Sequence, residues 1–158
     1  MSDMIRGSLE LGRMTWPLDS RLDTATNRDV IAWLKRVQPS AHSDVSSVLT
    51  DAMRGLPGAY HYCPDKHAYA YVAACTPEHG IFALAYGMSA LALRLGPGDR
   101  AVALAEGGCE PSEIGRDWLA ISGDGAVDLR RWCRAAFTYV SRLIDGAAPP
   151  ARQQQRRP

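Results

Sequence analysis

Residues 81–108, IFALAYGMSALALRLGPGDRAVALAEGG, decide the fold of this chain. They predict two short strands, over 81–85 and 90–95, that are joined by a tight turn and followed by a short helix. In the second strand the leucines lie on one face and the alanines on the other, which is the period of a half-buried strand. The stretch therefore belongs to a folded domain. It contains no catalytic group of its own.

Length and charge restrict what the chain can be. Its 158 residues suffice for one domain with a buried core and are too few for two. The net charge is only +1, which argues against a large nucleic-acid surface, because such a surface needs clustered cations. The cations without nearby acids lie in the C-terminal tail, at Arg152, Arg156 and Arg157.

The N-terminal segment predicts no export. Residues 1–16, MSDMIRGSLELGRMTW, are interrupted by charges every few positions and have no apolar signal-peptide core. No run approaches the roughly 18 apolar residues that a membrane helix needs. Four cysteines in a chain without a secretory signal are expected to be reduced thiols. We therefore expect a cytoplasmic protein with no membrane partner.

Composition along the chain predicts one domain between two loosely structured ends. Residues 1–25 lack a sustained period and are expected to form a poorly ordered arm. Residues 146–158, rich in arginine, glutamine and proline, are expected to form a disordered tail. The domain itself spans residues 26–145.

Periodicity and capping residues predict an α+β domain. Asn27 and Ser43 are expected to cap two N-terminal helices, and a 3.6-residue apolar stripe marks an amphipathic C-terminal helix. An antiparallel β-meander and one further strand lie between them. In chain order the elements are helices over 28–38 and from Ser43, strands over 68–75, 81–85 and 90–95, a short helix over 100–105, a strand over 117–121 holding Trp118, and a final helix from Asp124 or Asp128.

Two longer segments carry a family resemblance. GIFALAYGMSALALRLGPGDRAVALAEGG and GRDWLAISGDGAVDLRRWCRAAFTYVSRL are similar to the TfoX N-terminal domain family, with the YjbR/MmcQ group as a more distant relative. The resemblance covers roughly residues 80–145, and GAYHYCPDKHAYAYV stands where the family's Met-Phe-Gly-Gly motif is expected. The matching positions are Leu91, Leu93, Arg94, Gly96, Pro97, Gly115, Trp118, Asp128, Leu129, Trp132 and Ala135.

The resemblance implies the TfoX-like fold and a regulatory role without chemistry of its own. We expect a non-enzymatic regulatory or adaptor protein that needs no cofactor and binds another protein. A nucleic-acid-associated regulator, using arginines of the last helix and the tail, is an alternative. A homodimer also stays open, because the alanines of the meander, such as Ala74 and Ala92, form either a surface under the helices or a flat contact surface.

The outer face of the last helix is the candidate partner-binding surface. Four arginines gather there within four helical turns, at Arg130, Arg131, Arg134 and Arg142. Arg142 near the C-terminal end also complements the helix dipole. The same residues are compatible with a solvated face that binds nothing.

The HYCPDKH loop, residues 61–67, predicts a second alternative, a small-ligand or metal sensor. Its candidate ligands are His61, Cys63 and His67, which are side chains that zinc prefers. The spacing of Cys63 and His67 recurs at Cys75 and His79. If residues 68–74 form a strand, the two pairs lie roughly 23 Å apart and cannot share one ion.

Overall fold

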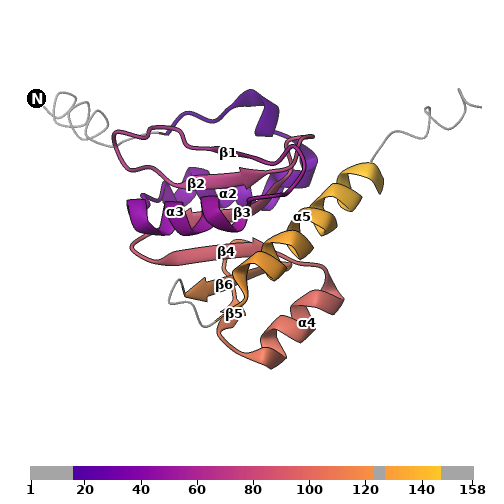
Figure 1. Ribbon diagram of the computed structural model, residues 1–158. Coiled ribbons are helices and arrows are strands. Elements are labelled where there is room, and N and C mark those ends of the chain that lie inside the picture. Colours follow the sequence, from indigo (N-terminus) through magenta and orange to yellow (C-terminus); the bar gives the residue numbers. More distant parts are fainter. Residues whose placement is uncertain (1–15, 123–126, 147–158) are drawn as a thin grey trace, which may run out of the picture.

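The computed structural model describes residues 16–122 and 127–146 and has the predicted α+β class (Figure 1). Its centre is a six-stranded antiparallel sheet in the order β1-β2-β3-β4-β6-β5. The strands are β1 (Tyr60–Tyr62), β2 (Val72–Cys75), β3 (Ile81–Tyr86), β4 (Ala90–Arg94), β5 (Cys109–Pro111) and β6 (Trp118–Ser122). The helices are α2 (Arg28–Val37), α3 (Ser43–Ala52), α4 (Pro97–Glu106) and α5 (Leu129–Gly146), and the 3-10 turns η1 (Ser20–Leu22) and η2 (Ala25–Asn27) precede α2.

Helices cover both faces of the sheet. Ala83 pairs with Leu93, which pairs with Leu119, and these side chains share one core with α3 and α5. Leu84 pairs with Ala92 on the opposite face, where α2 supplies the second core. Alternation along the strands therefore splits the alanines between two buried faces, so they form no single exposed contact surface.

The strands differ from the prediction in extent and number. The strand expected over 68–75 begins only at Val72, because Tyr69 adopts a left-handed backbone with a φ of 54°. The side chain of Tyr69 is 62% exposed, whereas Tyr71 is buried. The short strands β1 and β5, each of three residues, were not predicted.

The helices follow the predicted order, with changes at their ends. His42 caps α3 instead of Ser43, because the His42 ring accepts a hydrogen bond from the Asp44 backbone N–H. The short helix predicted over 100–105 extends over Pro97–Glu106. Asp128 precedes α5, and its carboxylate accepts from the Arg131 backbone N–H, whereas Asp124 lies outside the described residues. Within the described ranges, no helix has the length and apolarity needed to cross a bilayer.

Part of the expected N-terminal arm packs on the domain. Residues 1–15 lie outside the described ranges, as do 147–158 of the expected tail. Leu22 in η1 is 1% exposed within the core beside α2, so this part of the expected arm belongs to the folded domain. Asn27, which we expected to cap α2, makes no cap hydrogen bond. The amide of Asn27 instead donates to the carbonyls of Leu22 and His79 and accepts from the Ile81 backbone N–H.

The position of α5 is set by the turn between β2 and β3. A Cβ added at Gly80 would lie 2.5 Å from Val140 and 2.6 Å from Ile144, so only glycine allows α5 to pack this closely. Next to this turn, the pairing register between β2 and β3 shifts by one residue between Ala74 and Cys75, which is a β-bulge. Phe82, within the shift, stacks edge-to-face on Phe137 with ring centroids 5.5 Å apart. These contacts fix the helix that carries the predicted arginines.

Candidate functional site

A groove of about 710 Å³ separates α4 from α5, and three of the four predicted arginines line it. Trp132, Cys133, Ala136 and Val140 face the core, which turns the intervening positions of α5 outward. The α5 side of the groove includes Arg131, Arg134, Ala135, Thr138, Tyr139 and Arg142, and the α4 side includes Gly98, Asp99 and Val102. The groove is therefore cationic along one wall and partly apolar along the other.

The floor of the groove is anchored to the sheet. A Cβ at Gly96 would approach the Tyr139 ring to 2.9 Å, so glycine lets that ring lie against the start of α4. The Tyr139 hydroxyl donates to the Asp117 carboxylate, which also accepts from Arg94 at 2.8 Å. Arg94 in turn donates to the carbonyl of Thr26. Burial, and then the negative charge of Asp117, raise the pKa of Tyr139, so this hydroxyl stays neutral.

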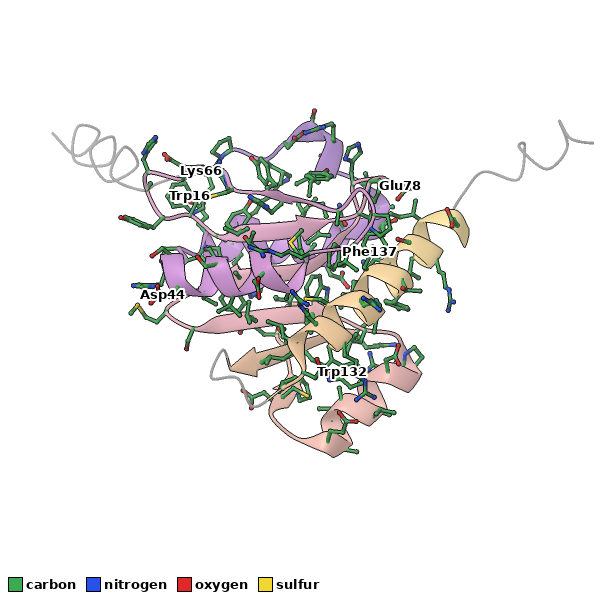
Figure 2. All side chains as sticks on the ribbon, in the orientation of Figure 1. Trp16, Asp44, Lys66, Glu78, Trp132 and Phe137 are labelled. Atoms are coloured by element: carbon green, nitrogen blue, oxygen red, sulfur yellow. The ribbon has the colours of Figure 1, made fainter. Side chains whose placement is uncertain are left out.

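Arg131 is held at the N-terminal end of the groove. Its guanidinium lies 3.0 Å and 3.3 Å from the two carboxylate oxygens of Glu106 on α4. The same guanidinium stacks over the ring of Trp132, 4.3 Å from the centroid; Trp132 is labelled in Figure 2. The Arg131 charge is thus partly neutralised, and the side chain bridges the two helices.

Arg134 and Arg142 are available to a partner. Both are exposed, and neither forms an ion pair within residues 16–122 and 127–146. Their eight-residue spacing corresponds to about 12 Å along the helix. Asp99 is the acidic side chain in the groove lining, and Glu106 pairs with Arg131, so Arg134 and Arg142 against Asp99 leave a net positive lining. Val102, 43% exposed, supplies apolar surface across from the arginines.

Arg130 does not belong to this groove. It borders a separate hollow between α3 and the start of α5, lined also by Val48, Asp51 and Asp128. The four predicted arginines are therefore divided between two hollows, and partner binding by any of them stays a prediction. Helical spacing placed all four outside the core, but only the position of α4 decides which of them share a groove.

The structure does not assemble the predicted metal ligands. Among the described residues, no three His, Cys, Asp or Glu side chains lie close enough together to hold a metal ion. His61 and Cys63 line a cavity of about 270 Å³ beside α3, and His67 does not. The Cys63 thiol donates to the Ala70 carbonyl, and burial raises its pKa, which opposes the thiolate that zinc requires.

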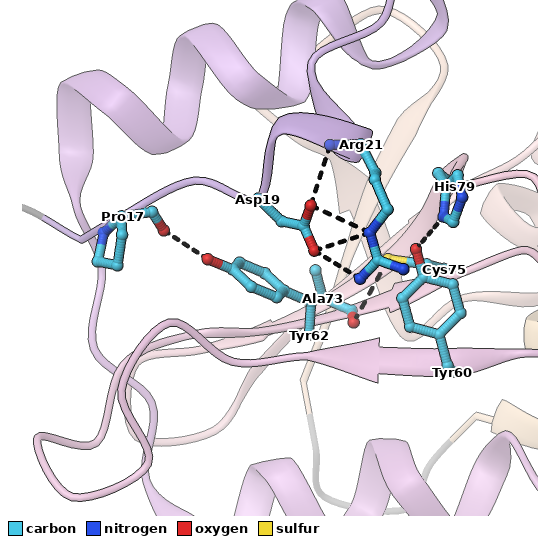
Figure 3. Close-up of polar contacts among 8 residues, drawn as sticks. All are labelled: Pro17, Asp19, Arg21, Tyr60, Tyr62, Ala73, Cys75 and His79. Carbon is cyan, nitrogen blue, oxygen red and sulfur yellow. Dashed lines mark hydrogen bonds and ion pairs between the residues drawn. The ribbon is translucent and has the colours of Figure 1, made fainter.

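One polar cluster was not predicted from the sequence (Figure 3). The Tyr60 hydroxyl and His79 Nδ1 share a hydrogen bond, and the Arg21 guanidinium of η1 lies 5.9 Å from the centre of the Tyr60 ring. Cys75 pairs with Tyr60 in the sheet, and its buried thiol donates to the Ala73 carbonyl. Burial raises the pKa of both Tyr60 and Cys75 to about 12. The cluster joins η1, β1 and the β2–β3 turn, and a neutral phenol and thiol there fit a structural role.

We expect the four thiols to react slowly with a disulfide reagent in the native protein. Burial raises the pKa of Cys75 and Cys133 to about 12, and it also raises the pKa of Cys63 and Cys109. Since the thiolate is the nucleophile, the rate should rise with pH for the half-buried pair and stay near zero for the buried pair. Mass spectrometry of modified peptides measures each site, with guanidinium-unfolded protein as the fully reactive control. Fast modification of Cys75 or Cys133 without unfolding would contradict this assignment.

Comparison of the chain with protein-family models, with curated proteins and with solved structures finds no match. The TfoX-like resemblance therefore stays a prediction from the residues quoted above, and function has to be argued from the groove itself.

Proposed function

We propose that this protein is a non-enzymatic regulator or adaptor that binds another protein, and that the groove between α4 and α5 receives an acidic segment of its partner. One observation carries the proposal. Two exposed arginines without ion-pair partners among the described residues, Arg134 and Arg142, flank a groove whose opposite wall is partly apolar.

The geometry of the groove defines the partner's chemistry. Carboxylates about 12 Å apart would reach Arg134 and Arg142 together. Apolar side chains between them would cover Val102 and the ring of Tyr139. Arginine and aromatic residues are the types enriched where protein interfaces bind most strongly. An amphipathic acidic segment therefore fits the groove better than a uniformly charged polymer does.

The reactive side chains support a binding role over catalysis. All four thiols are shifted toward the protonated form, so none is an activated nucleophile. The Tyr60–His79 pair borders none of the cavities described above. Four free cysteines also fit a reducing compartment, in keeping with the expected cytoplasmic location, which is part of the proposal.

Charge reversal in the groove should strongly reduce partner capture. With a photo-reactive phenylalanine analogue at Thr138 in the groove, irradiated cells should yield a covalent adduct with one main protein. The double variant Arg134→Glu, Arg142→Glu should reduce that adduct at least about tenfold, because each attraction becomes a repulsion. Mass spectrometry identifies the adduct, and a titration with the purified partner measures the change in affinity.

Arg130→Glu is the control, because it reverses one charge on the same helix outside the groove; it is compared with the single variants Arg134→Glu and Arg142→Glu as well as with the double variant. It should leave the adduct unchanged. An equal loss from Arg130→Glu would show a nonspecific charge effect and overturn the assignment of the groove. Nuclease-sensitive capture that weakens steeply with salt would instead favour the nucleic-acid alternative, in which Arg152, Arg156 and Arg157, outside the described residues, would contribute.

A further inference from the structure

A second cavity, of about 330 Å³, lies between the ordered N-terminal segment and α2, away from the arginine groove. Its volume falls at the small end of the roughly 300–1,000 Å³ that ligand pockets occupy. Its walls are mostly apolar, formed by Trp16, Leu18, Ile31, Leu34 and Tyr71, with Lys35 among the polar lining residues.

The outer wall of this cavity is held in place by hydrogen bonds. The Trp16 indole N–H donates to the Gln38 carbonyl at the end of α2, 3.2 Å away. The Tyr62 hydroxyl donates to the Pro17 carbonyl at 2.6 Å (Figure 3). Asp19 then caps η1 by accepting from the Arg21 backbone N–H and pairing with the Arg21 guanidinium. These contacts hold the wall in place before a ligand binds, so little binding free energy would be lost to ordering it.

The side chain of Tyr71 lines this cavity. Tyr71 is 2% exposed, and its hydroxyl forms no hydrogen bond with another described residue. No side-chain nitrogen or oxygen in the described part of the chain is both fully enclosed and without a partner. The cavity that Tyr71 lines is the open space beside this side chain, so a ligand there could pair with the hydroxyl. Burial raises the pKa of Tyr71, so the hydroxyl stays neutral and can donate.

Lys35 adds one positive charge to the same cavity. It lies in the last turn of α2, is exposed, and forms no ion pair within the described ranges. An anionic group on a ligand could therefore pair with its ammonium group without displacing an internal partner. The cavity thus offers an aromatic and aliphatic surface, one neutral hydrogen-bonding hydroxyl and one cation.

We infer that this cavity binds a small aromatic acid, with the ring between Trp16 and α2, the carboxylate toward Lys35 and a second polar group against the Tyr71 hydroxyl. The charge of Lys35 selects a carboxylate over a neutral ligand. The Tyr71 hydroxyl selects a ligand that carries a hydroxyl over one that lacks it, because an unmatched buried polar group costs binding free energy.

Three related probes test both selections on the full chain: 4-hydroxyphenylacetate, its neutral amide, and phenylacetate. For ligands of this size we expect dissociation constants on the order of 1 mM for the hydroxy acid and weaker values for the other two. Titration followed by ¹H–¹⁵N NMR should move the indole N–H resonance of Trp16 and leave that of Trp132, on α5, unchanged. Absence of binding at concentrations about tenfold above that constant would overturn the inference.

Two variants remove one contact each. Tyr71→Phe should weaken the binding of 4-hydroxyphenylacetate about three- to tenfold and leave the binding of phenylacetate unchanged. Lys35→Gln should weaken the binding of 4-hydroxyphenylacetate about two- to fivefold and leave the binding of its neutral amide unchanged. Tyr69→Phe and Lys66→Gln, which make the same changes outside this cavity, should alter nothing. Binding that no variant changes would also overturn the inference, and neither result bears on the arginine groove.

Discussion

Trp118→Ala and Trp132→Ala are each expected to lower the free energy of unfolding by about 3–5 kcal/mol. Trp118 in β6 is 1% exposed and belongs to the core beside α2, and Trp132 in α5 is 2% exposed in the core on the other face. Truncation leaves a large cavity in either core. Trp132→Ala also removes the surface under the Arg131 guanidinium, worth about 0.5–2 kcal/mol more. Urea unfolding monitored by circular dichroism measures both losses.

Met88→Ala is the control for this pair. Met88 is 77% exposed on the hairpin between β3 and β4, so its truncation should leave the free energy of unfolding within about 0.5 kcal/mol of the parent. Tryptophan variants that match the parent would contradict the two-core arrangement. A loss at Trp118 alone would place α5 outside the core.

The elements with a clear period were the ones that the sequence could predict. Leucines alternate with other residues in β4, and α2 and α5 repeat every 3.6 residues, so these elements were visible in the residues themselves. The predicted half-burial of β4 was wrong, because helices cover both faces of the sheet and bury Ala92 as well as Leu91 and Leu93. β1 and β5 have three residues each, too few to show a period. Tyr69 and Tyr71 appeared equivalent, since a two-residue period cannot reveal that the left-handed backbone at Tyr69 interrupts the strand.

The candidate groove was predictable only in part, for a related reason. Helical spacing identifies which arginines of α5 avoid the core, because the core stripe of that helix is continuous. Helical spacing contains no information on where α4 lies. The position of α4 is what separates Arg131, Arg134 and Arg142, which line the groove, from Arg130, which does not. The cavity beside Tyr71 depends on residues more than fifty positions apart meeting in space, so no local pattern could have indicated it.

Asn27 shows most clearly how a local interpretation can miss a long-range role. Its position before α2 is typical of a cap, yet its side chain joins three separate segments of the chain. Leu22 precedes it, while His79 and Ile81 lie more than fifty residues later, at the turn that also receives α5. Asn27 is 0% exposed, so water cannot replace the lost hydrogen bonds after a substitution.

Asn27→Ala is expected to lower the free energy of unfolding by about 2–6 kcal/mol. The Ile81 N–H and the His79 carbonyl would lose their partner, and each buried group left without one costs about 1–3 kcal/mol. The Leu22 carbonyl is less affected, because it also accepts from the Thr24 N–H. This loss should not depend on pH, because neither alanine nor asparagine titrates.

Asn27→Asp should be at least as destabilising near neutral pH, and its loss should depend on pH. The introduced carboxylate would be buried against the carbonyls of Leu22 and His79. Burial and the negative ends of the two carbonyl dipoles both disfavour the ionised form, so they raise the pKa of this carboxyl in the folded protein. A raised folded-state pKa means that the variant regains stability as pH falls through that value, since the protonated carboxyl can donate one of the two lost hydrogen bonds. Urea unfolding of the parent and both variants across this pH range measures the two differences. A loss for Asn27→Asp that is constant with pH, or smaller than that of Asn27→Ala at neutral pH, would show that Asn27 does not act as the donor that joins η1 to the β2–β3 turn.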